Sequence, residues 1–203
     1  MSSPASSAPS FNAVAQELCE AGRFAFARGW LPATSGNLSA LYDGGMAITR
    51  SGCHTGELTP ADILPADLQG RSDQGRPSAE TGIHVALYER LDIGAVLHTH
   101  SPLATVLSLR GTHELVVEDY EIQKAFSGVS THEAPLHVPI VPNDQDIQRL
   151  VRGLPADLGV GFLIAGHGLY TWGRDVADAR VHLEALEFLF QCESLRIQLG
   201  VSR

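Results

Sequence analysis

Two histidines one residue apart, His98 and His100, end an apolar run that begins at Ile93 and has the length of a buried strand. Side chains at positions i and i+2 of a strand point to the same face, so both imidazole rings can reach one metal ion. A chain that uses the pair in this way must contain a sheet. The spacing therefore predicts half of a zinc site at the end of one of its strands.

A third histidine, His167, lies between Gly166 and Gly168 and interrupts two apolar, strand-like runs. Glycine allows a sharp turn and lets another element approach closely, as a ligand delivered from a loop requires. Three imidazoles leave a zinc ion with open coordination positions, which is the mark of a catalytic site. Any one of these histidines alone is more often an ordinary hydrogen-bonded residue. Their combination favours a metal site.

Length and charge restrict the class of protein. The chain has 203 residues, enough for one domain over residues 11–203 with a sizeable core. Its net charge is −9, with only 14 lysines and arginines and no basic run, which argues against a nucleic-acid partner. No apolar run approaches the roughly 20 residues that a membrane helix needs.

The first ten residues are rich in serine, proline and alanine and have neither a basic start nor an apolar centre. They predict a disordered tail over residues 1–10 rather than a secretory signal. The three cysteines, Cys19, Cys53 and Cys192, are far apart and form no Cys-x-x-Cys pattern. A disulfide framework is therefore not expected, and a reducing cytoplasm fits best.

Helical and strand-like patterns alternate along the chain. Helices are predicted over residues 11–28, 78–90, 101–109, 144–152 and 175–199, with a short helix start at 59–62. The fourth is expected to be capped by Asn143 and ended by Gly153. Strands are predicted over residues 93–100 and in a hairpin formed by 34–39 and 46–49. This order predicts an α/β fold, a sheet covered by helices on both faces.

Three short segments could hold an anion, because backbone N–H groups at turns and helix starts form anion-binding concavities. Their residues are Ser35, Gly36, Asn37, Ser51, Gly52, Ser78 and Ala79. Each segment alone is more often a simple turn or cap. The prediction of an anion site therefore requires that all three converge in space.

Two carboxylates are candidates for proton transfer. Glu80 is expected in the first turn of its helix, where the dipole favours a carboxylate, although it could also lie on a solvated face. Glu121 lies in a mixed segment whose periodicity decides nothing. Two further histidines, His84 and His182, fall on predicted helices and are expected at the surface or at the edge of the core rather than as ligands.

Taken in order, these motifs resemble the class II aldolase and adducin family, which includes zinc-dependent sugar-phosphate enzymes. The resemblance is carried by segments 35–39, 51–52, 77–81, 98–101 and 166–168 and extends over nearly the whole chain after residue 10. Its specific part is the His-Thr-His element with the later Gly-His-Gly. It implies a three-layer α/β/α domain around a largely antiparallel central sheet. It also implies a homotetramer with four-fold symmetry and sites at subunit interfaces.

The resemblance further implies residue roles. His98, His100 and His167 would bind one Zn²⁺ per subunit. Segments 78–81, 95–101, 121–125, 138–143 and 167–173 look most like the dehydratases of the family. By that likeness Glu121 matches their proton donor and acceptor, whereas Glu80 matches the acid/base of the related aldolases.

One departure concerns the phosphate. Dehydratases of this kind often carry a lysine after the second Ser-Gly pair, whereas residues 51–55 contain none. The phosphate would then depend on backbone donors, on Arg50 or on a neighbouring subunit, or the substrate differs. The expected activity is loss of water from a ketose phosphate through a zinc-stabilised enediolate. A sugar-phosphate aldolase or epimerase, and a non-catalytic module like the adducin head domain, remain as alternatives.

Overall fold

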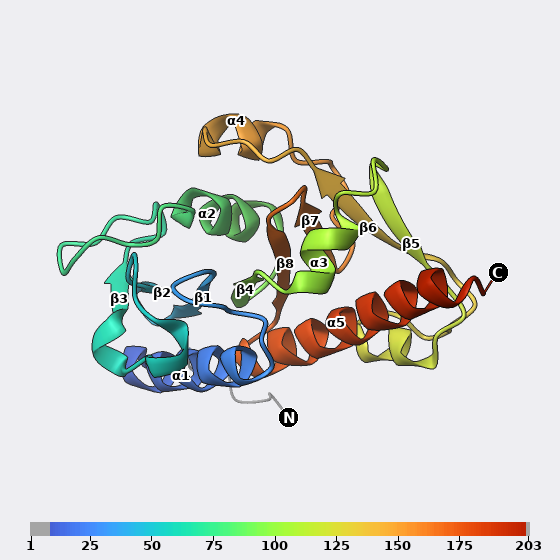
Figure 1. The fold of residues 1–203 in the computed structure, drawn as a ribbon. Helices are drawn as coiled ribbons and strands as arrows, with labels where there is room; N and C mark the ends of the chain where they lie inside the picture. Colours follow the sequence, from blue (N-terminus) through green and yellow to red (C-terminus); the bar gives the residue numbers. More distant parts are fainter. Residues whose placement is uncertain (1–8, 202–203) are drawn as a thin grey trace, which may run out of the picture.

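The computed structural model describes residues 9–201, which build a three-layer α/β/α arrangement around an eight-stranded sheet (Figure 1). The strand order is β3-β2-β1-β4-β8-β7-β6-β5. Their bounds are β1 Asn37–Tyr42, β2 Gly45–Thr49, β3 Ile63–Ala66, β4 Ala95–Thr99, β5 Glu114–Val117, β6 Leu136–Val141, β7 Gly161–Ile164 and β8 Gly168–Gly173. Neighbouring strands run antiparallel except β6 and β7, which are parallel. The largely antiparallel sheet is therefore confirmed.

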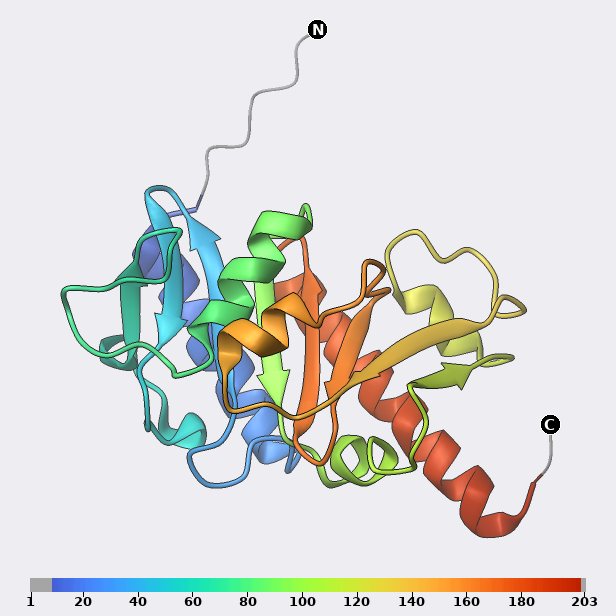
Figure 2. The same ribbon diagram turned by 90° about the horizontal axis from the view of Figure 1, so that it is seen from above.

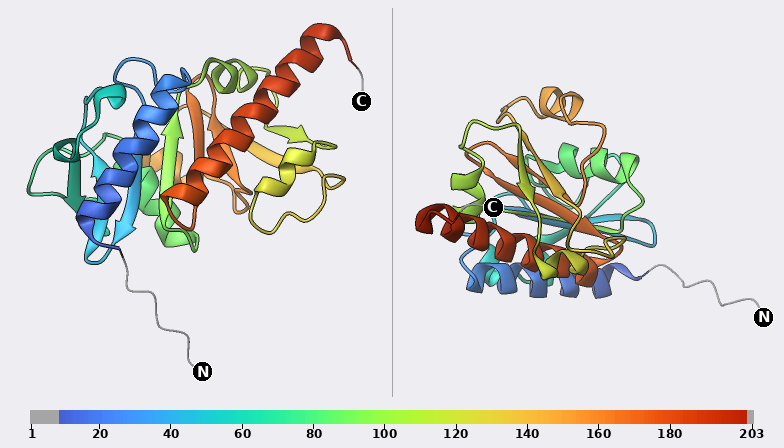
Figure 3. Two further views of the ribbon diagram at one scale, coloured as in Figure 1. Left: turned by 90° about the horizontal axis from the view of Figure 1, so that it is seen from below. Right: turned by 90° about the vertical axis from the view of Figure 1, so that its right-hand side faces the viewer.

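Helices lie on both faces of the sheet, as predicted. The α-helices are α1 Phe11–Ala27, α2 Thr81–Arg90, α3 Pro102–Leu107, α4 Ile147–Arg152 and α5 Val176–Leu199. Seen from above, α2 and α4 cross in front of the strands (Figure 2), and seen from below α1 and α5 do so (Figure 3). One apolar core lies between the sheet and α1 and α5, and a second lies beneath α2 and α4.

Side-chain caps explain where most helices begin. Ser10, Ser101 and Asp175 each accept a hydrogen bond from a backbone N–H three residues later, and they start α1, α3 and α5. Gly200 ends α5 in the left-handed conformation that favours glycine. The tail expected over residues 1–10 falls outside the described residues for 1–8, whereas Ser10 belongs to the first cap. Within residues 9–201 no helix is both long and apolar enough to cross a membrane.

Two predicted boundaries are wrong for local reasons. The helix expected from residue 78 begins at Thr81, because Ser78 forms a preceding turn in which its carbonyl accepts from Thr81 Oγ1 at 2.6 Å. Asn143 is not the cap of α4, since Asp146 accepts from the Arg149 N–H at 3.1 Å. The short helix start predicted at 59–62 is confirmed as a single 3-10 turn, η2 Pro60–Asp62, which Thr59 caps and β3 follows at once.

The strand predicted over residues 93–100 is shorter in the structure, where β4 spans Ala95–Thr99 and His100 is the next residue. β4 lies between β1 and β8, with His98 opposite Asn37 on one side and Tyr170 on the other. The centre of the sheet therefore presents His98 together with these two polar side chains.

Candidate active site

Three histidine side chains converge at the end of β4. The Nε2 atom of His98 lies 2.8 Å from that of His100 and 3.3 Å from that of His167, and the latter two are 3.2 Å apart. Nitrogen ligands about 2.0–2.1 Å from a tetrahedral zinc ion are themselves about 3.3–3.4 Å apart. The three imidazoles therefore form a cluster that could hold a metal ion.

The backbone around the cluster orients each ring. The Leu169 carbonyl lies 2.9 Å from His98 Nδ1, which donates to it and leaves Nε2 free to accept a metal. The His100 N–H donates to the Trp30 carbonyl at 2.8 Å. A Cβ at Gly168 would overlap the carbonyl oxygen of Thr99. The close approach predicted for this glycine is thus found where β8 enters the sheet beside β4.

Two of the imidazoles are held in the neutral form. Burial, followed by the neighbouring His98 and His167, lowers the pKa of His100 to about 3. Burial, followed by His98, also lowers the pKa of His167. Because the neutral imidazole is the form that binds metal, both rings are ready to act as ligands at neutral pH.

Glu80 lies against this cluster. Its Oε2 is 3.2 Å from His98 Nε2 and its Oε1 is 3.4 Å from His167 Nε2. Asn37 Nδ2 and the Tyr170 hydroxyl donate to Oε2 at 2.8 and 3.0 Å. Burial raises the pKa of Glu80, but the neighbouring His98, His167 and Asn37 outweigh it and hold the pKa far below its usual range.

The environment of Glu80 differs from both sequence expectations. It is the residue before α2 rather than part of the first turn, and its side chain is only 16% exposed rather than on a solvated face. The side chain is held by Tyr170, which belongs to β8 and was not singled out from the sequence. Tyr170 stacks on His98 with ring centroids 4.0 Å apart. Its place beside Glu80 depends on the pairing of β8 with β4, which no local sequence pattern indicates.

The three predicted anion segments converge. They line one pocket of about 390 Å³ together with Glu80, His100 and His167. The segment residues that line it are Ser35, Gly36, Asn37, Ser51, Gly52, Ser78 and Ala79. The loop before α4 also contributes, through Asn143, Asp144 and Gln145, which the sequence did not identify as site residues. The pocket thus brings the three segments together with two of the clustered histidines.

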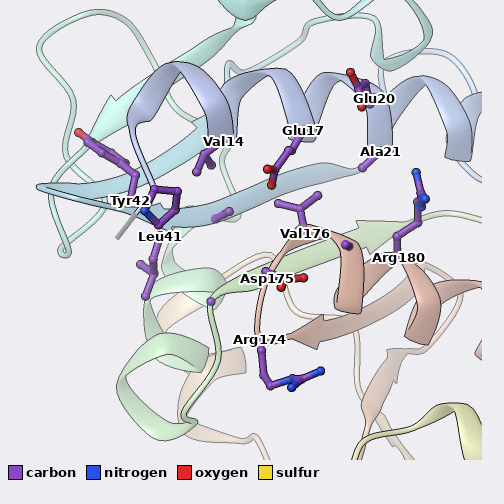
Figure 4. A pocket seen from close by; sticks show the side chains of 14 residues that line it. Val14, Glu17, Glu20, Ala21, Leu41, Tyr42, Arg174, Asp175, Val176 and Arg180 are labelled. Carbon is purple, nitrogen blue, oxygen red and sulfur yellow. The ribbon is translucent and has the colours of Figure 1, made fainter. Parts of the chain in front are cut away.

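A larger pocket lies elsewhere. Its volume is about 680 Å³, and it lies between α1 and the start of α5 (Figure 4). Glu17, Glu20, Arg174, Asp175 and Arg180 supply its charged groups, and none of the clustered histidines lines it. Size alone therefore does not identify the candidate active site, whereas the chemistry of the smaller pocket favours it.

Glu121 is not brought to the cluster within one chain. It begins η3 Glu121–Ala125, and its side chain is 74% exposed. The carboxylate lies 2.8 Å from Lys124 Nζ and 3.4 Å from His132 Nδ1, and the hydrogen bond from Lys124 lowers its pKa. Glu121 does not line the pocket that contains the histidines.

Two histidines expected at the surface or at the edge of the core are buried. His84 has no exposed area and is hydrogen-bonded to Ser39 and Asn37. His182 is 5% exposed and donates from Nδ1 to the Trp172 carbonyl at 2.6 Å. Helical periodicity could not place them, because polar partners on neighbouring strands stabilise both rings in the interior.

The chain is similar to known proteins over nearly its whole length. The family model of the class II aldolase and adducin N-terminal domain matches residues 16–194. A methylthioribulose-1-phosphate dehydratase from Methylococcus capsulatus is 53% identical over 192 residues, covering 91% of this chain and 94% of that protein.

Two crystal structures are similar in fold. YgbL from Escherichia coli has a TM-score of 0.79 and 26% identity, covering 92% of this chain and 90% of that one. The l-fuculose-1-phosphate aldolase from Thermus thermophilus has a TM-score of 0.74 and 26% identity, covering 94% of this chain and 97% of that one.

Proposed function

Because the chain belongs to the class II aldolase and adducin family, we propose that it removes water from 5-methylthioribulose 1-phosphate and forms 2,3-diketo-5-methylthiopentyl 1-phosphate. This is the dehydration step of methionine salvage, and the protein is accordingly a hydro-lyase. The choice of reaction rests on the 53% identity to a methylthioribulose-1-phosphate dehydratase over 91% of this chain. The pocket supports it, since two of the three potential metal ligands, His100 and His167, line it together with the largely buried carboxylate of Glu80 and the three converging segments.

His98, His100 and His167 are the proposed ligands of one Zn²⁺ per subunit. Bound there, zinc would supply a Lewis acid for the negative charge that develops on the substrate, an effect worth several kcal/mol. The donor set fits this ion, because the three Nε2 atoms face one another and at least two of the rings are neutral.

Dehydration also needs groups that move protons. The C3 proton must be removed and the C4 hydroxyl must leave as water, and a positioned acid or base typically contributes about 10²–10⁴-fold. Glu121 is the proposed proton donor and acceptor. Since it lies on the surface, its proposed place of action is the pocket of a neighbouring subunit. Glu80 is the alternative acid/base, because its carboxylate already lies against His98 and His167.

The phosphate is proposed to bind at the segments 35–37, 51–52 and 78–79, through backbone N–H groups. Arg50 lines the same pocket, although its guanidinium also donates to the Ala61 carbonyl at 3.0 Å. This arrangement would replace the lysine that related dehydratases often carry. We further propose a cytoplasmic homotetramer without nucleic-acid or membrane partners.

One incubation tests the reaction. Zinc-loaded protein is mixed with 5-methylthioribulose 1-phosphate, and the products are scored for the diketone phosphate against an aldehyde plus dihydroxyacetone phosphate. Formation of the diketone, lost in His98→Ala, supports dehydration. Cleavage into two fragments would instead assign an aldolase.

The aldolase is the second candidate, because the carboxylate found beside the histidines is Glu80, which matches the acid/base of the family's aldolases. An adducin-like interaction module is the third. Elemental analysis that finds no divalent ion in the purified protein, together with no turnover, would favour that module.

A further inference from the structure

A chain of buried hydrogen bonds runs from Glu80 away from the pocket. Asn37 Nδ2 donates to Glu80 Oε2 at 2.8 Å, and the other end of that amide, Oδ1, is hydrogen-bonded to His84 Nε2. His84 Nδ1 lies 2.7 Å from Ser39 Oγ, which lies 2.8 Å from the Tyr88 hydroxyl. Asn37, Ser39 and His84 are all buried. His84, Ser39 and Tyr88 do not line the pocket that contains Glu80.

The orientation of the Asn37 amide fixes the direction of the bonds in this chain. Its NH₂ group donates to Glu80 and its oxygen, which can only accept, faces His84. His84 must then carry its proton on Nε2, and its Nδ1 accepts from the Ser39 hydroxyl. The Ser39 oxygen in turn accepts from Tyr88.

His84 is suited to a fixed, neutral role. Burial lowers its pKa to about 3, and the charges of His98 and Glu80 act in opposite directions on it. The ring is also held edge-on against Tyr170, with centroids 5.7 Å apart. Burial likewise raises the pKa of Tyr170, as does Glu80, so its hydroxyl stays protonated and continues to donate to Glu80 Oε2.

We propose that His84, held as its Nε2–H tautomer, is a positioning residue that aligns the Asn37 amide and so fixes the orientation of the Glu80 carboxylate. Oε2 of Glu80 then accepts from Asn37 and Tyr170, and Oε1, which faces His167, is the oxygen presented to the substrate. That Oε1 faces the substrate rests on the proposed function. The side-chain amide of Asn37 therefore acts on Glu80, and only the backbone of this residue is left for the proposed anion site.

The tautomer can be measured without any turnover. Long-range ¹H–¹⁵N spectra of the zinc-loaded protein, labelled at histidine, distinguish a protonated from an unprotonated ring nitrogen. His84 is expected to carry its proton on Nε2 from pH 6 to 8. His182 is a matched internal reference with the opposite tautomer, because its Nδ1 donates to Trp172 and its Nε2 accepts from the Ser127 N–H at 3.3 Å. His84→Gln and His182→Gln assign the signals. A proton on His84 Nδ1, or exchange between tautomers, would overturn the proposal.

The kinetics of two substitutions distinguish a positioning role of His84 from a purely structural contact between α2 and β1. His84→Gln can still place an N–H group near Asn37 Oδ1, whereas His84→Leu cannot. His84→Leu is expected to lower kcat by about 10–100-fold with a smaller change in KM and full zinc content. His84→Gln should recover most of this loss. Equal kcat for both variants, or a loss confined to KM, would contradict the proposal.

His182→Leu is the control for destabilisation, since it also removes a buried histidine but lies away from Glu80. It should lower the melting temperature without lowering kcat. If His84→Leu does not fold, the tautomer of the unsubstituted protein still decides the question. The two proposals also fail separately. An inactive protein with the expected tautomer would refute only the dehydration, and an active protein with the other tautomer would refute only the role of His84.

Discussion

Each of the three clustered histidines is held at its backbone or its ring by a different element. His98 donates from its ring to Leu169 in β8, His100 donates from its backbone to Trp30 after α1, and the carbonyl of His167 accepts from Thr105 in α3 at 3.1 Å. Removing one ring therefore leaves the other two in place. Single substitutions can separate metal binding from proton transfer.

His98→Ala is expected to lose both bound metal and turnover, since it removes the buried proposed ligand at the centre of the cluster. Glu121→Gln should keep its metal and lose about 10²–10⁴-fold in kcat, because only proton transfer is removed. Elemental analysis and steady-state kinetics measure the two effects. His113→Ala, at an exposed histidine outside the cluster, is the control and should retain both. If Glu121→Gln retains full activity, the proton transfer is assigned to Glu80 instead.

At the scale of the elements, the turn between β7 and β8 delivers His167. Gly168→Ala would force its new Cβ against the Thr99 carbonyl, so we expect β8 to shift away from β4 and the metal to bind more weakly. Overpacking of this kind costs about 1–3 kcal/mol. Gly153→Ala is the control, because a Cβ there meets only ordinary contacts at 3.4 and 3.5 Å. Thermal unfolding and a zinc titration measure the difference, and equal behaviour of the two variants would contradict it.

Helix α5 carries a carboxyl group behind the strand that bears the histidines. Glu187 is 3% exposed, and burial raises its pKa to about 7 against an opposing hydrogen bond from Ser101. The folded state thus binds this proton more tightly than the unfolded state, whose pKa is near 4.5. The resulting stability is complete below pH 4.5 and is lost as the pH rises through 7.

Glu187→Gln should therefore flatten the decline in melting temperature between pH 5 and pH 8 and raise stability at pH 8. The gain at pH 8 is expected to be at most about 3 kcal/mol. Glu184→Gln, on the same helix but with a side chain 40% exposed, should leave the pH dependence unchanged. If the melting temperature of Glu187→Gln falls between pH 5 and pH 8 as steeply as that of the unsubstituted protein, the Glu187 carboxyl ionises freely in the folded state.

Some features near the site could be predicted from sequence and others could not. The difference is the separation along the chain of the residues that interact. The histidine pair and the glycine-flanked histidine are local patterns, and both could be identified from sequence. The boundaries at Ser78 and Asn143 failed because competing polar side chains a few residues away form better turns or caps. The setting of Glu80 could not be predicted, since Tyr170 lies 90 positions later in the chain.

At the scale of the whole molecule, the position of Glu121 raises the question of how many chains make one site. The residue lies outside the histidine pocket of its own chain, while the family resemblance implies sites between subunits. If neighbouring subunits supply Glu121, two inactive variants should complement each other. His98→Ala retains a working Glu121, and Glu121→Gln retains a working histidine cluster.

Co-expression of these two variants with different affinity tags, followed by purification through both tags, tests this. In a ring of randomly mixed subunits about one quarter of the sites combine both working parts, so about a quarter of the normal activity should return. Each variant purified alone is the control. Mixed oligomers that remain inactive would place Glu121 at the site of its own chain or outside catalysis.

The two ligand segments of the cluster are separated by 69 positions between His98 and His167, and β8 has to pair with β4 before the third ring arrives. A nascent chain on the ribosome that has not yet extended beyond residue 173 therefore offers only two of the three clustered imidazoles in place. The proposed capture of zinc would then be a late event of biosynthesis that follows completion of the central strands. Chelators present during translation should accordingly leave the yield of folded apoprotein unchanged.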